Sequence, residues 1–429
     1  MIYVNMRRMV DPGGKKGSLR AEAKTNRPRR RQPQATLRDV NRTILLSLIQ
    51  VHQPVSRARL AEMTGTFRST VSEIVKDLVA SGLVSETRAE PSGRGRVPVL
   101  LRVNDHGFEV VAVNVRPERT TVALAGLSAK PSRTVSFATP ANPNALLTKL
   151  AGAIDNLCAD RGKYRLKGIR EIGVSVPGLV DAAAGRIRWL PYLPGYSDFD
   201  MAGAVRDRFG IRTAVDNDAN LAVLAIAWRA QLEEHSVRDF VFVEIGTEGV
   251  GAGIIVNGEL YRGHNSTLAA EFGHMVVEAN GIPCGCGRRG CWERYVCDHA
   301  TLQRYRPGIT FSPEAYASFL RAVSDGEAAA TAAFRETARY LAIGLANIGF
   351  ALNPSSIVVA GHVCGAWALI SPVIEEALSA IRFPIRVNQA PASADELFLK
   401  GAILLALNSV FSQPTLGLNV TPGVKTAHS

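Results

Sequence analysis

Long apolar runs and a secretion signal are missing from this 429-residue sequence, and six cysteines are few for its length. No stretch approaches the roughly 20 consecutive apolar residues of a membrane-spanning helix, and the first residues lack the apolar core of a secretory signal. We therefore predict a cytoplasmic protein without a membrane partner. In that reducing compartment, clustered cysteines indicate a metal site rather than a disulfide framework.

Acidic residues are scarce at the start of the chain. Residues 1–35 hold ten Lys and Arg but only two Asp and Glu, and residues 36–105 hold ten against seven. Since the whole chain carries a net charge of +12, the remainder is nearly neutral. A basic beginning on a neutral body is typical of a nucleic-acid-binding segment joined to a second module. A solvated basic tail without a partner is the alternative. Residues 1–35 also lack apolar periodicity, which predicts a disordered tail.

Residues 36–105 have the pattern of a winged helix-turn-helix DNA-binding domain. Apolar residues recur at helical spacing in two segments, and Ser56 is placed to cap a short helix between them that ends at Gly65. The predicted elements are helices at 36–49, 57–64 and 69–81 and strands at 83–85 and 99–103. We expect the DNA contacts to come from the third helix and from the wing tip, at Arg68, Ser69, Thr70, Ser72, Lys76, Arg94 and Arg96.

From residue 106 onward, strands alternate with helices in two similar sets. We assign 106–232, together with a closing helix in 395–410, to a first lobe, 233–394 to a second lobe, and 411–429 to a flexible tail. Each set opens with two strands that read as a hairpin. Two α/β lobes built in this way resemble a duplicated ribonuclease H or actin-like fold, in which a ligand binds in the cleft between the lobes.

Four of the six cysteines lie between positions 284 and 297. One imidazole and three thiolates form a closed ligand set for a structural zinc ion, namely His274, Cys284, Cys286 and Cys291. Glycines at 285, 287 and 290 would let the backbone turn tightly around the ion, and Glu271 and Glu293 would be carried toward the same point. We predict one Zn²⁺ per chain. A purely structural zinc knuckle is an alternative, and a disulfide is a weaker one.

Five motifs in this order, SVPGLVD, VDNDAN, GVGAGIIVNG, AEFGH and CGCGRRGCWE, resemble those of the ROK family of repressors and sugar kinases. The resemblance runs from about Val40 to the C-terminal helix. It implies that the His and three Cys bind zinc and that the flanking groups face a sugar. The sugar-binding residues that it implies are Gly178, Asn217, Asp218, Glu271, His274 and Glu293. Taken alone, Asp218 could instead cap a helix, and Pro177-Gly178 could be an ordinary turn.

In the family's kinases, the aspartate that matches Asp218 takes a proton from the attacking sugar hydroxyl. Those kinases also have a glycine-rich loop whose backbone N–H groups reach the phosphates of ATP. The corresponding stretch here is 114–119, where Asn114 lacks the carboxylate that would hold magnesium. Pro117 has no N–H to donate, and Glu118 brings negative charge toward a polyphosphate. Asp218 is therefore a catalytic residue only if the protein is a kinase.

Two further departures weaken a nucleotide site, since the second phosphate loop contains Glu248 and His362 replaces one of a pair of glycines. We predict a sensor and not an enzyme: a transcriptional regulator, most simply a repressor, whose partners are an operator in double-stranded DNA and a small sugar. We also expect a homodimer or homotetramer. A sugar kinase with a fused DNA-binding domain is the alternative. A repressor that ignores sugar and uses zinc only for folding is a third possibility.

Overall fold

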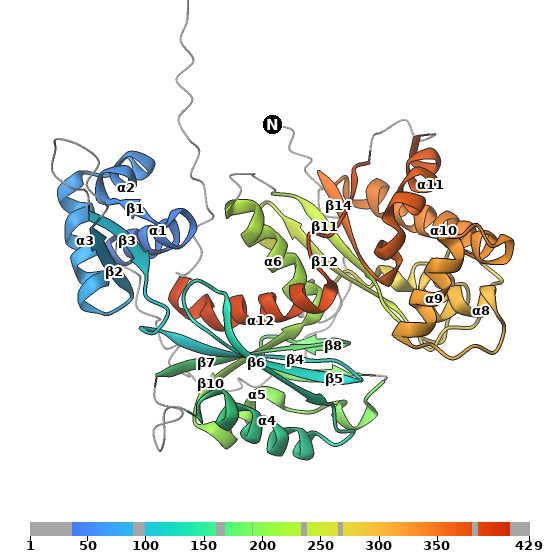
Figure 1. Cartoon of the computed structure of the whole chain (residues 1–429), viewed down its shortest axis with the longest axis horizontal. Helices are drawn as coiled ribbons and strands as arrows, with labels where there is room; N and C mark the ends of the chain where they lie inside the picture. Colours follow the sequence, from blue (N-terminus) through green and yellow to red (C-terminus); the bar gives the residue numbers. More distant parts are fainter. Residues whose placement is uncertain are drawn as a thin grey trace, which may run out of the picture.

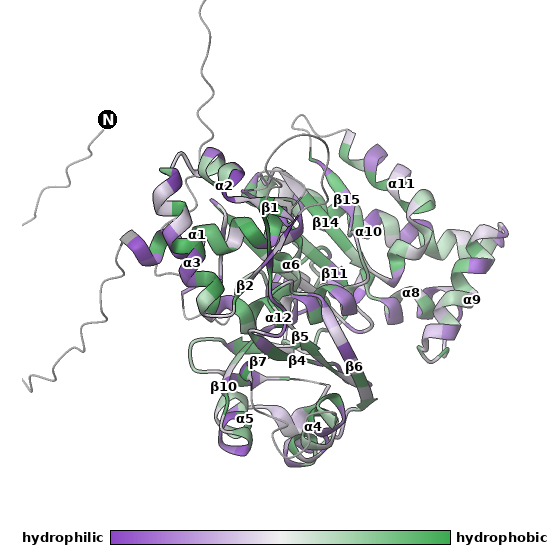
Figure 2. Cartoon of the chain, turned by 60° about the vertical axis from the view of Figure 1, so that its left-hand side comes forward, coloured by the Kyte–Doolittle hydropathy of each residue, from purple (hydrophilic) through white to green (hydrophobic). Residues whose placement is uncertain are grey.

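Two five-stranded sheets with a pair of helices between them form the body of the protein. The computed structural model describes residues 37–88, 99–159, 168–190, 192–232, 238–264, 269–379 and 385–411. The predicted tail at 1–35, the predicted tail from 412 onward, and the wing residues Arg94 and Arg96 lie outside these ranges. Hydrophobic residues concentrate in the strands of both sheets and in the layer between them (Figure 2).

The N-terminal part has the predicted winged-helix order. Its elements are α1 (Leu37–His52), β1 (Val55–Ser56), α2 (Arg57–Thr64), α3 (Arg68–Ala80), β2 (Val84–Arg88) and β3 (Val99–Val103). Ser56 accepts a hydrogen bond from the backbone N–H of Arg59, and Gly65 ends α2 in the left-handed conformation, so both predicted helix boundaries are confirmed. The third helix begins one residue earlier than predicted. The strand predicted at 83–85 starts one residue later and continues to Arg88.

The first sheet of the body has the strand order β10-β7-β4-β5-β6. Its strands are β4 (Glu109–Val115), β5 (Arg119–Ala125), β6 (Pro131–Ala138), β7 (Ile169–Val176) and β10 (Arg212–Asn217). The outer face is covered by α4 (Pro143–Leu157) and α5 (Met201–Phe209). The predicted opening hairpin is β4 with β5. Strand β6 was not predicted, because it is an exposed edge strand with few apolar positions. A small hairpin of β8 (Leu179–Asp181) and β9 (Arg186–Trp189) follows β7.

The second sheet has the order β13-β12-β11-β14-β15. Its strands are β11 (Phe240–Ile245), β12 (Val250–Val256), β13 (Glu259–Leu260), β14 (Ser356–Gly361) and β15 (Val387–Gln389). The second strand of this sheet's opening hairpin, β12, is followed by a turn in which Asn257 and Gly258 both have positive φ, and β13 comes after it. Its outer face is covered by α7 (Glu293–Val296), α8 (Asp298–Tyr305), α9 (Pro313–Ser324), α10 (Ala328–Leu352) and α11 (Trp367–Ser379).

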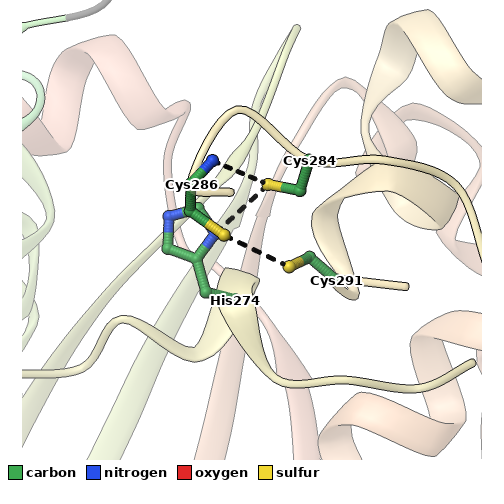
Figure 3. A group of neighbouring side chains, drawn as sticks. All are labelled: His274, Cys284, Cys286 and Cys291. Carbon is green, nitrogen blue, oxygen red and sulfur yellow. Dashed lines mark hydrogen bonds between the residues drawn. The ribbon is translucent and has the colours of Figure 1, made fainter. Parts of the chain in front are cut away.

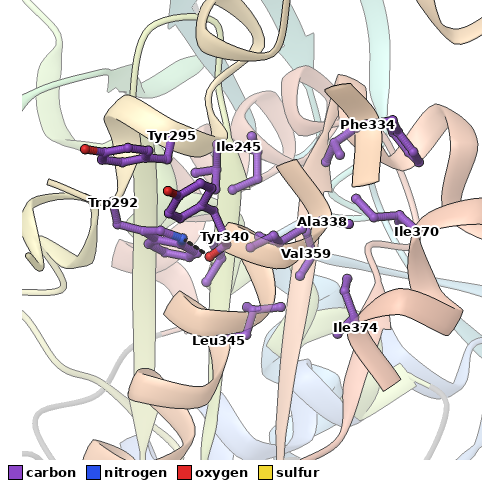
Figure 4. Close-up of a cluster of buried hydrophobic side chains, with 14 of the residues drawn as sticks. Ile245, Trp292, Tyr295, Phe334, Ala338, Tyr340, Leu345, Val359, Ile370 and Ile374 are labelled. Atoms are coloured by element: carbon purple, nitrogen blue, oxygen red, sulfur yellow. Dashed lines mark hydrogen bonds between the residues drawn. The ribbon is translucent and has the colours of Figure 1, made fainter. Parts of the chain in front are cut away.

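A large apolar cluster joins this second sheet to its outer helices (Figure 4). Trp292 is fully buried in it, and its indole N–H donates a hydrogen bond to the backbone oxygen of Tyr340, 2.7 Å away. Trp292 directly follows Cys291, so the loop that carries Cys284, Cys286 and Cys291 is anchored in the core at its C-terminal end. None of the described helices is long and apolar enough to cross a membrane.

Helices α6 (Asp218–Leu232) and α12 (Ala394–Phe411) form the layer between the two sheets. They approach each other closely because α12 has glycine at the crossing: a Cβ on Gly401 would lie 2.2 Å from the backbone oxygen of Leu221. A Cβ on Gly173 of β7 would lie 2.1 Å from the oxygen of Ala402. The closing helix is longer than expected, since it includes Phe411, the first residue of the predicted tail.

The winged helix packs directly on this middle layer. One apolar cluster contains Ile49 of α1, Leu221 of α6 and Leu407 of α12. Gln50 is buried, and its side-chain amide donates a hydrogen bond to the backbone oxygen of Leu127. The winged helix and the body therefore share one core.

Replacing Gly401 with alanine should destabilise the protein, because the new methyl group would meet backbone and not a movable side chain. Overpacking of this kind costs about 1–3 kcal/mol. Gly152→Ala is the matched control, since no described atom lies within 4 Å of the added Cβ and the site is an exposed position of α4. The control should gain about 0.5–1 kcal/mol. Thermal unfolding of both variants would measure the two opposite shifts, and an unchanged stability of Gly401→Ala would contradict the close crossing.

Candidate functional site

One histidine and three cysteines converge on a single point (Figure 3). The potential ligand atoms of His274, Cys284, Cys286 and Cys291 all lie within 4.8 Å of one another. Two separations are 3.6 Å: Cys284 Sγ to His274 Nδ1, and Cys286 Sγ to Cys291 Sγ. A tetrahedral ion with metal–sulfur bonds of about 2.3 Å has sulfurs about 3.8 Å apart. The group is therefore compact enough to hold a tetrahedral metal ion.

Tight turns bring these ligands together. His274 ends the short helix η3 (Phe272–His274), and isolated bridges pair Val276 with Cys291 and Pro283 with Arg289. Gly290 has a φ of 74°, and a Cβ there would lie only 1.6 Å from the oxygen of Glu278.

Gly287 also has a positive φ, whereas Gly285 has neither a positive φ nor a described atom within 4 Å of an added Cβ. The expectation that all three glycines are needed is therefore wrong at Gly285.

Two carboxylates adjoin the ligand cluster. Glu293, the first residue of α7, has Oε1 2.9 Å from Cys284 Sγ and 3.4 Å from His274 Nδ1. Glu271 Oε2 is 3.9 Å from His274 Nε2, on the other side of the ring. The Nδ1 side of the imidazole thus faces the sulfurs, while the Nε2 side faces Glu271. The metal ligands and the two acidic residues named from the sequence are all brought together.

Two of the remaining predicted sugar residues, Asn217 and Asp218, lie where β10 ends and α6 begins, and the third, Gly178, lies between β7 and β8. Asn217 Oδ1 accepts a hydrogen bond from the N–H of Asn220, 3.1 Å away, and Asn217 Nδ2 donates to the oxygen of Gly178 at 2.9 Å. Asn217 is therefore the N-cap of α6, while Asp218 is its first residue and accepts a hydrogen bond from the N–H of Ala219, 2.8 Å away. Gly178 has a φ of 81°, and a Cβ there would lie 2.4 Å from the oxygen of Trp189, so this turn requires glycine.

Asp218 is held by an arginine whose role sequence reasoning missed. Arg116, between β4 and β5, places Nη1 2.6 Å from Asp218 Oδ2 and Nη2 3.0 Å from Glu244 Oε1 of β11. Its Nε lies 3.8 Å from Asp395 Oδ1 at the start of α12. Both Asp218 and Glu244 are buried. Burial raises the pKa of Asp218 to about 7, Arg116 opposes that rise, and Glu244 adds to it.

In the sequence, Arg116 could be recognised only as a basic residue in the stretch 114–119, which stands where the family's kinases have a glycine-rich loop. Its partners come from three separate parts of the chain, so the loop alone could not reveal them.

The other two departures from the kinase pattern are also paired with neighbouring side chains. His299 Nδ1 is 3.2 Å from Glu248 Oε1, which lies in the loop between β11 and β12. His362, at the start of η4 (His362–Ala366), has Nδ1 2.6 Å from Oδ2 of the fully buried Asp298. Burial raises the pKa of Asp298 to about 6, and the contact with His362 opposes that rise.

The predicted DNA-contacting residues in the described part of the chain lie on α3. Arg68, Ser69 and Lys76 are exposed, whereas Thr70 and Ser72 are half-buried. The opposite side of the helix packs inward through Val71, Ile74, Val75 and Leu78. Exposed residues here that the sequence analysis did not include are Phe67, Glu73, Asp77 and Ala80.

These features define a two-sheet α/β body of the actin-like class with an N-terminal winged helix and a metal-ligand cluster in its second half. Residues 110–408 match the sequence profile of the ROK family, and residues 39–95 match that of the MarR family. The chain belongs to the ROK family, with a MarR-type winged helix at its N-terminus. The resemblance inferred from the five motifs is thereby confirmed, as is the fold class.

Curated relatives include regulators of transcription. The chain is 29% identical over 335 residues to the xylose repressor of Bacillus subtilis (strain 168), covering 77% of this chain and 84% of the repressor. It is 26% identical over 380 residues to the DNA-binding transcriptional dual regulator NagC of Escherichia coli (strain K12), covering 86% and 91%.

Solved structures of both regulators and kinases share the fold. A ROK family transcriptional regulator described as a homologue of the E. coli MLC protein superposes with a TM-score of 0.71 at 21% identity, covering 87% of this chain and 97% of that one. A ROK family glucokinase from Streptomyces griseus, in complex with glucose and AMPPNP, gives a TM-score of 0.57 at 25% identity, covering 70% and 99%. The regulator match thus includes more of this chain than the kinase match does.

Removal of one sulfur should empty the metal site. We expect elemental analysis of protein purified without chelators to find one metal ion per chain, and Cys286→Ser to lose it, because three remaining ligands no longer close the tetrahedron. Cys364→Ser is the control, since Cys364 lies outside the cluster and donates to the oxygen of Val359. Metal-free wild-type protein, or a Cys286→Ser variant that keeps its ion, would contradict the assignment.

Proposed function

We propose that this protein is a sugar-responsive transcriptional regulator, most simply a repressor of carbohydrate-metabolism genes. It binds double-stranded DNA through α3 and the wing, and a sugar between its two sheets. The names of the xylose repressor and of NagC support this proposal. The observation that carries it is the course of helix α6, which begins at Asp218 in the candidate sugar site and ends beside the winged helix.

Near the far end of α6, Trp228 connects the body to the DNA-binding part. Its indole N–H lies 3.5 Å from Oε1 of Gln50 in α1, and the ammonium of Lys400 in α12 stands 3.8 Å from the centre of its ring. A displacement of α6 caused by a sugar at Asp218 would therefore be transmitted to the winged helix. Regulation requires only that sugar and DNA prefer different arrangements of these elements.

The residues proposed to bind the sugar suit a polyol. Hydroxyls that lose water need hydrogen-bond partners, and Asp218, Glu271 and Glu293 supply carboxylate acceptors. The metal that this donor set suits best is Zn²⁺, held through His274 Nδ1 and the three thiolates. Zinc would order the loop that carries Glu293, leaving His274 Nε2 free to donate a hydrogen bond outward.

A sugar kinase with a fused DNA-binding domain is the second candidate, and it is favoured by the presence of Asp218. The geometry around this residue supports the sensor instead. A catalytic base must reach the hydroxyl whose proton it takes, yet one oxygen of Asp218 is already held by the guanidinium of Arg116. The same guanidinium also binds Glu244, so a cation of the protein itself fills the region between these carboxylates.

Asp218→Asn should remove most of the sugar affinity while leaving operator binding nearly intact. The variant keeps the shape of the side chain but offers an NH₂ group where a hydroxyl needs an acceptor. A hydrogen bond to a charged group contributes about 1.5–3 kcal/mol, so affinity should fall about ten- to a hundredfold. Calorimetric titration with xylose, N-acetylglucosamine and glucose would measure this loss. Asp207→Asn, an exposed position on α5, is the matched control.

An ATP-turnover assay on the same proteins separates the two candidates. The regulator should show no turnover with any of the three sugars. Turnover in the wild type that disappears in Asp218→Asn would overturn the sensor in favour of the kinase, since a catalytic aspartate acts on the transition state more than on binding.

Trp228→Phe should uncouple the two sites. Phenylalanine keeps most of the apolar contact but has no N–H to donate to Gln50, so sugar should bind normally while changing operator affinity less than in the wild type. Fluorescence anisotropy of labelled operator DNA, with and without sugar, measures the coupling. Trp367→Phe on α11, at the other side of the second sheet, should respond like the wild type. A full sugar response in Trp228→Phe would show that this contact does not carry the signal.

A further inference from the structure

The residue before the recognition helix is the most exposed large apolar side chain in the described part of the chain. Phe67 is 83% exposed. It occupies the N-cap of α3, and its side chain forms no capping hydrogen bond with any described residue. The caps of α2, α4, α5 and α9 are Ser56, Asn142, Asp200 and Ser312, each of which accepts such a bond.

Phenylalanine at this position does not help the domain to fold. A polar N-cap would stabilise α3, and none of the apolar clusters formed by the described residues includes Phe67. A single exposed apolar residue is unremarkable by itself. What distinguishes Phe67 is its position, because the start of the second helix of a helix-turn-helix is the part that meets base edges in the major groove.

The side chains that neighbour Phe67 are also suited to contact DNA. Arg68 and Ser69 follow Phe67 directly and are exposed, and Lys76 is exposed further along the helix. Two positive charges and a hydroxyl suit phosphates and base edges, so the phenyl ring would be carried to the DNA with them. Phenylalanine forms no hydrogen bond with a base edge. The feature of the major groove that it can recognise is apolar, and that feature is the C5 methyl group of thymine.

We infer that Phe67 is a specificity-determining residue that contacts the methyl group of one thymine in each half-site of the operator. This inference rests on the proposed DNA-binding function and adds to it one base that the protein distinguishes. Only thymine among the four bases has this methyl group. The contact therefore selects T over C at that position, with a modest factor that follows from the burial of a single methyl group.

The test removes the methyl group and nothing else. A preferred site is first selected from a random duplex library with the full-length wild-type protein, and each thymine is then replaced in turn by deoxyuridine, which pairs identically. We expect one replacement per half-site to weaken wild-type binding about fourfold, the factor expected for one buried carbon group. Phe67→Ser should bind the thymine and uracil sites equally well at that position.

Two measurements distinguish a loss of thymine recognition from an unfolded or nonspecifically damaged variant. Serine is a good N-cap, so Phe67→Ser should unfold at a higher temperature than the wild type. Phe350→Ser is the matched control: Phe350 is 60% exposed, but it lies at the end of α10, among the outer helices of the second sheet. This control should keep the wild-type preference for thymine over uracil.

The possible results separate this inference from the function on which it rests. A wild-type protein that binds a selected site tightly but tolerates uracil at every position would overturn the role of Phe67 alone. So would a Phe67→Ser variant that still prefers thymine at the sensitive position. A wild-type protein that binds no duplex would overturn the proposed function as well.

Discussion

The ion pairs of Arg116 connect the parts of the body that a ligand in the cleft would have to move. A single guanidinium, on the turn between two strands of the first sheet, binds Asp218 at the start of α6 and Glu244 in the second sheet. Both carboxylates are buried. Without the arginine, two like charges would face each other in a region of low dielectric, and loss of one partner of a buried pair costs about 3–5 kcal/mol. Arg116 therefore links the turn between β4 and β5 to the start of α6 and to the second sheet.

The two helices of the middle layer connect the Arg116 contacts to the winged helix. Asp218 and Asp395, which both approach Arg116, lie at the beginnings of α6 and α12. Further along these helices, Trp228 and Lys400 stack on each other, and Trp228 reaches Gln50 of α1. Because glycine at the crossing allows backbone to meet backbone, the helices have little freedom to slide independently. A change at their beginnings is thus expected to reach the DNA-binding part as a rigid displacement.

The same framework serves kinases and regulators, and a few side chains separate the two uses. Asp218 remains in place, but Arg116 holds it. Glu248 and His362, which stand where a phosphate site would be rich in glycine, are paired with His299 and Asp298. In this chain, each of these departures from the kinase pattern is thus paired with a side chain of the protein itself. The proposed sugar site would need only hydrogen-bond acceptors for the hydroxyls of a polyol and no phosphate loop.

The sequence by itself determined the features whose signals are local. The winged helix, the α2 cap at Ser56 and the four clustered ligands follow from residues close together in the chain, where spacing and residue type restrict the geometry directly. The order of strands and helices also sufficed for two lobes that open with hairpins. Strand β6 was not predicted, because its sequence has little apolar pattern. The sequence also did not show that the loop has no need of glycine at position 285, because that depends on the atoms around the position.

Only the tertiary structure decided which distant residues meet. Arg116 binds partners 102 and 128 positions away, and Gln50 meets an indole 178 positions away. No spacing rule links such residues, since they are brought together by the packing of two sheets on a shared pair of helices. The candidate ligands were therefore recognisable in the sequence, whereas the charge that restrains Asp218 and the contact that joins α6 to the winged helix were not. Both depend on how the elements pack, and packing is a property of the whole fold.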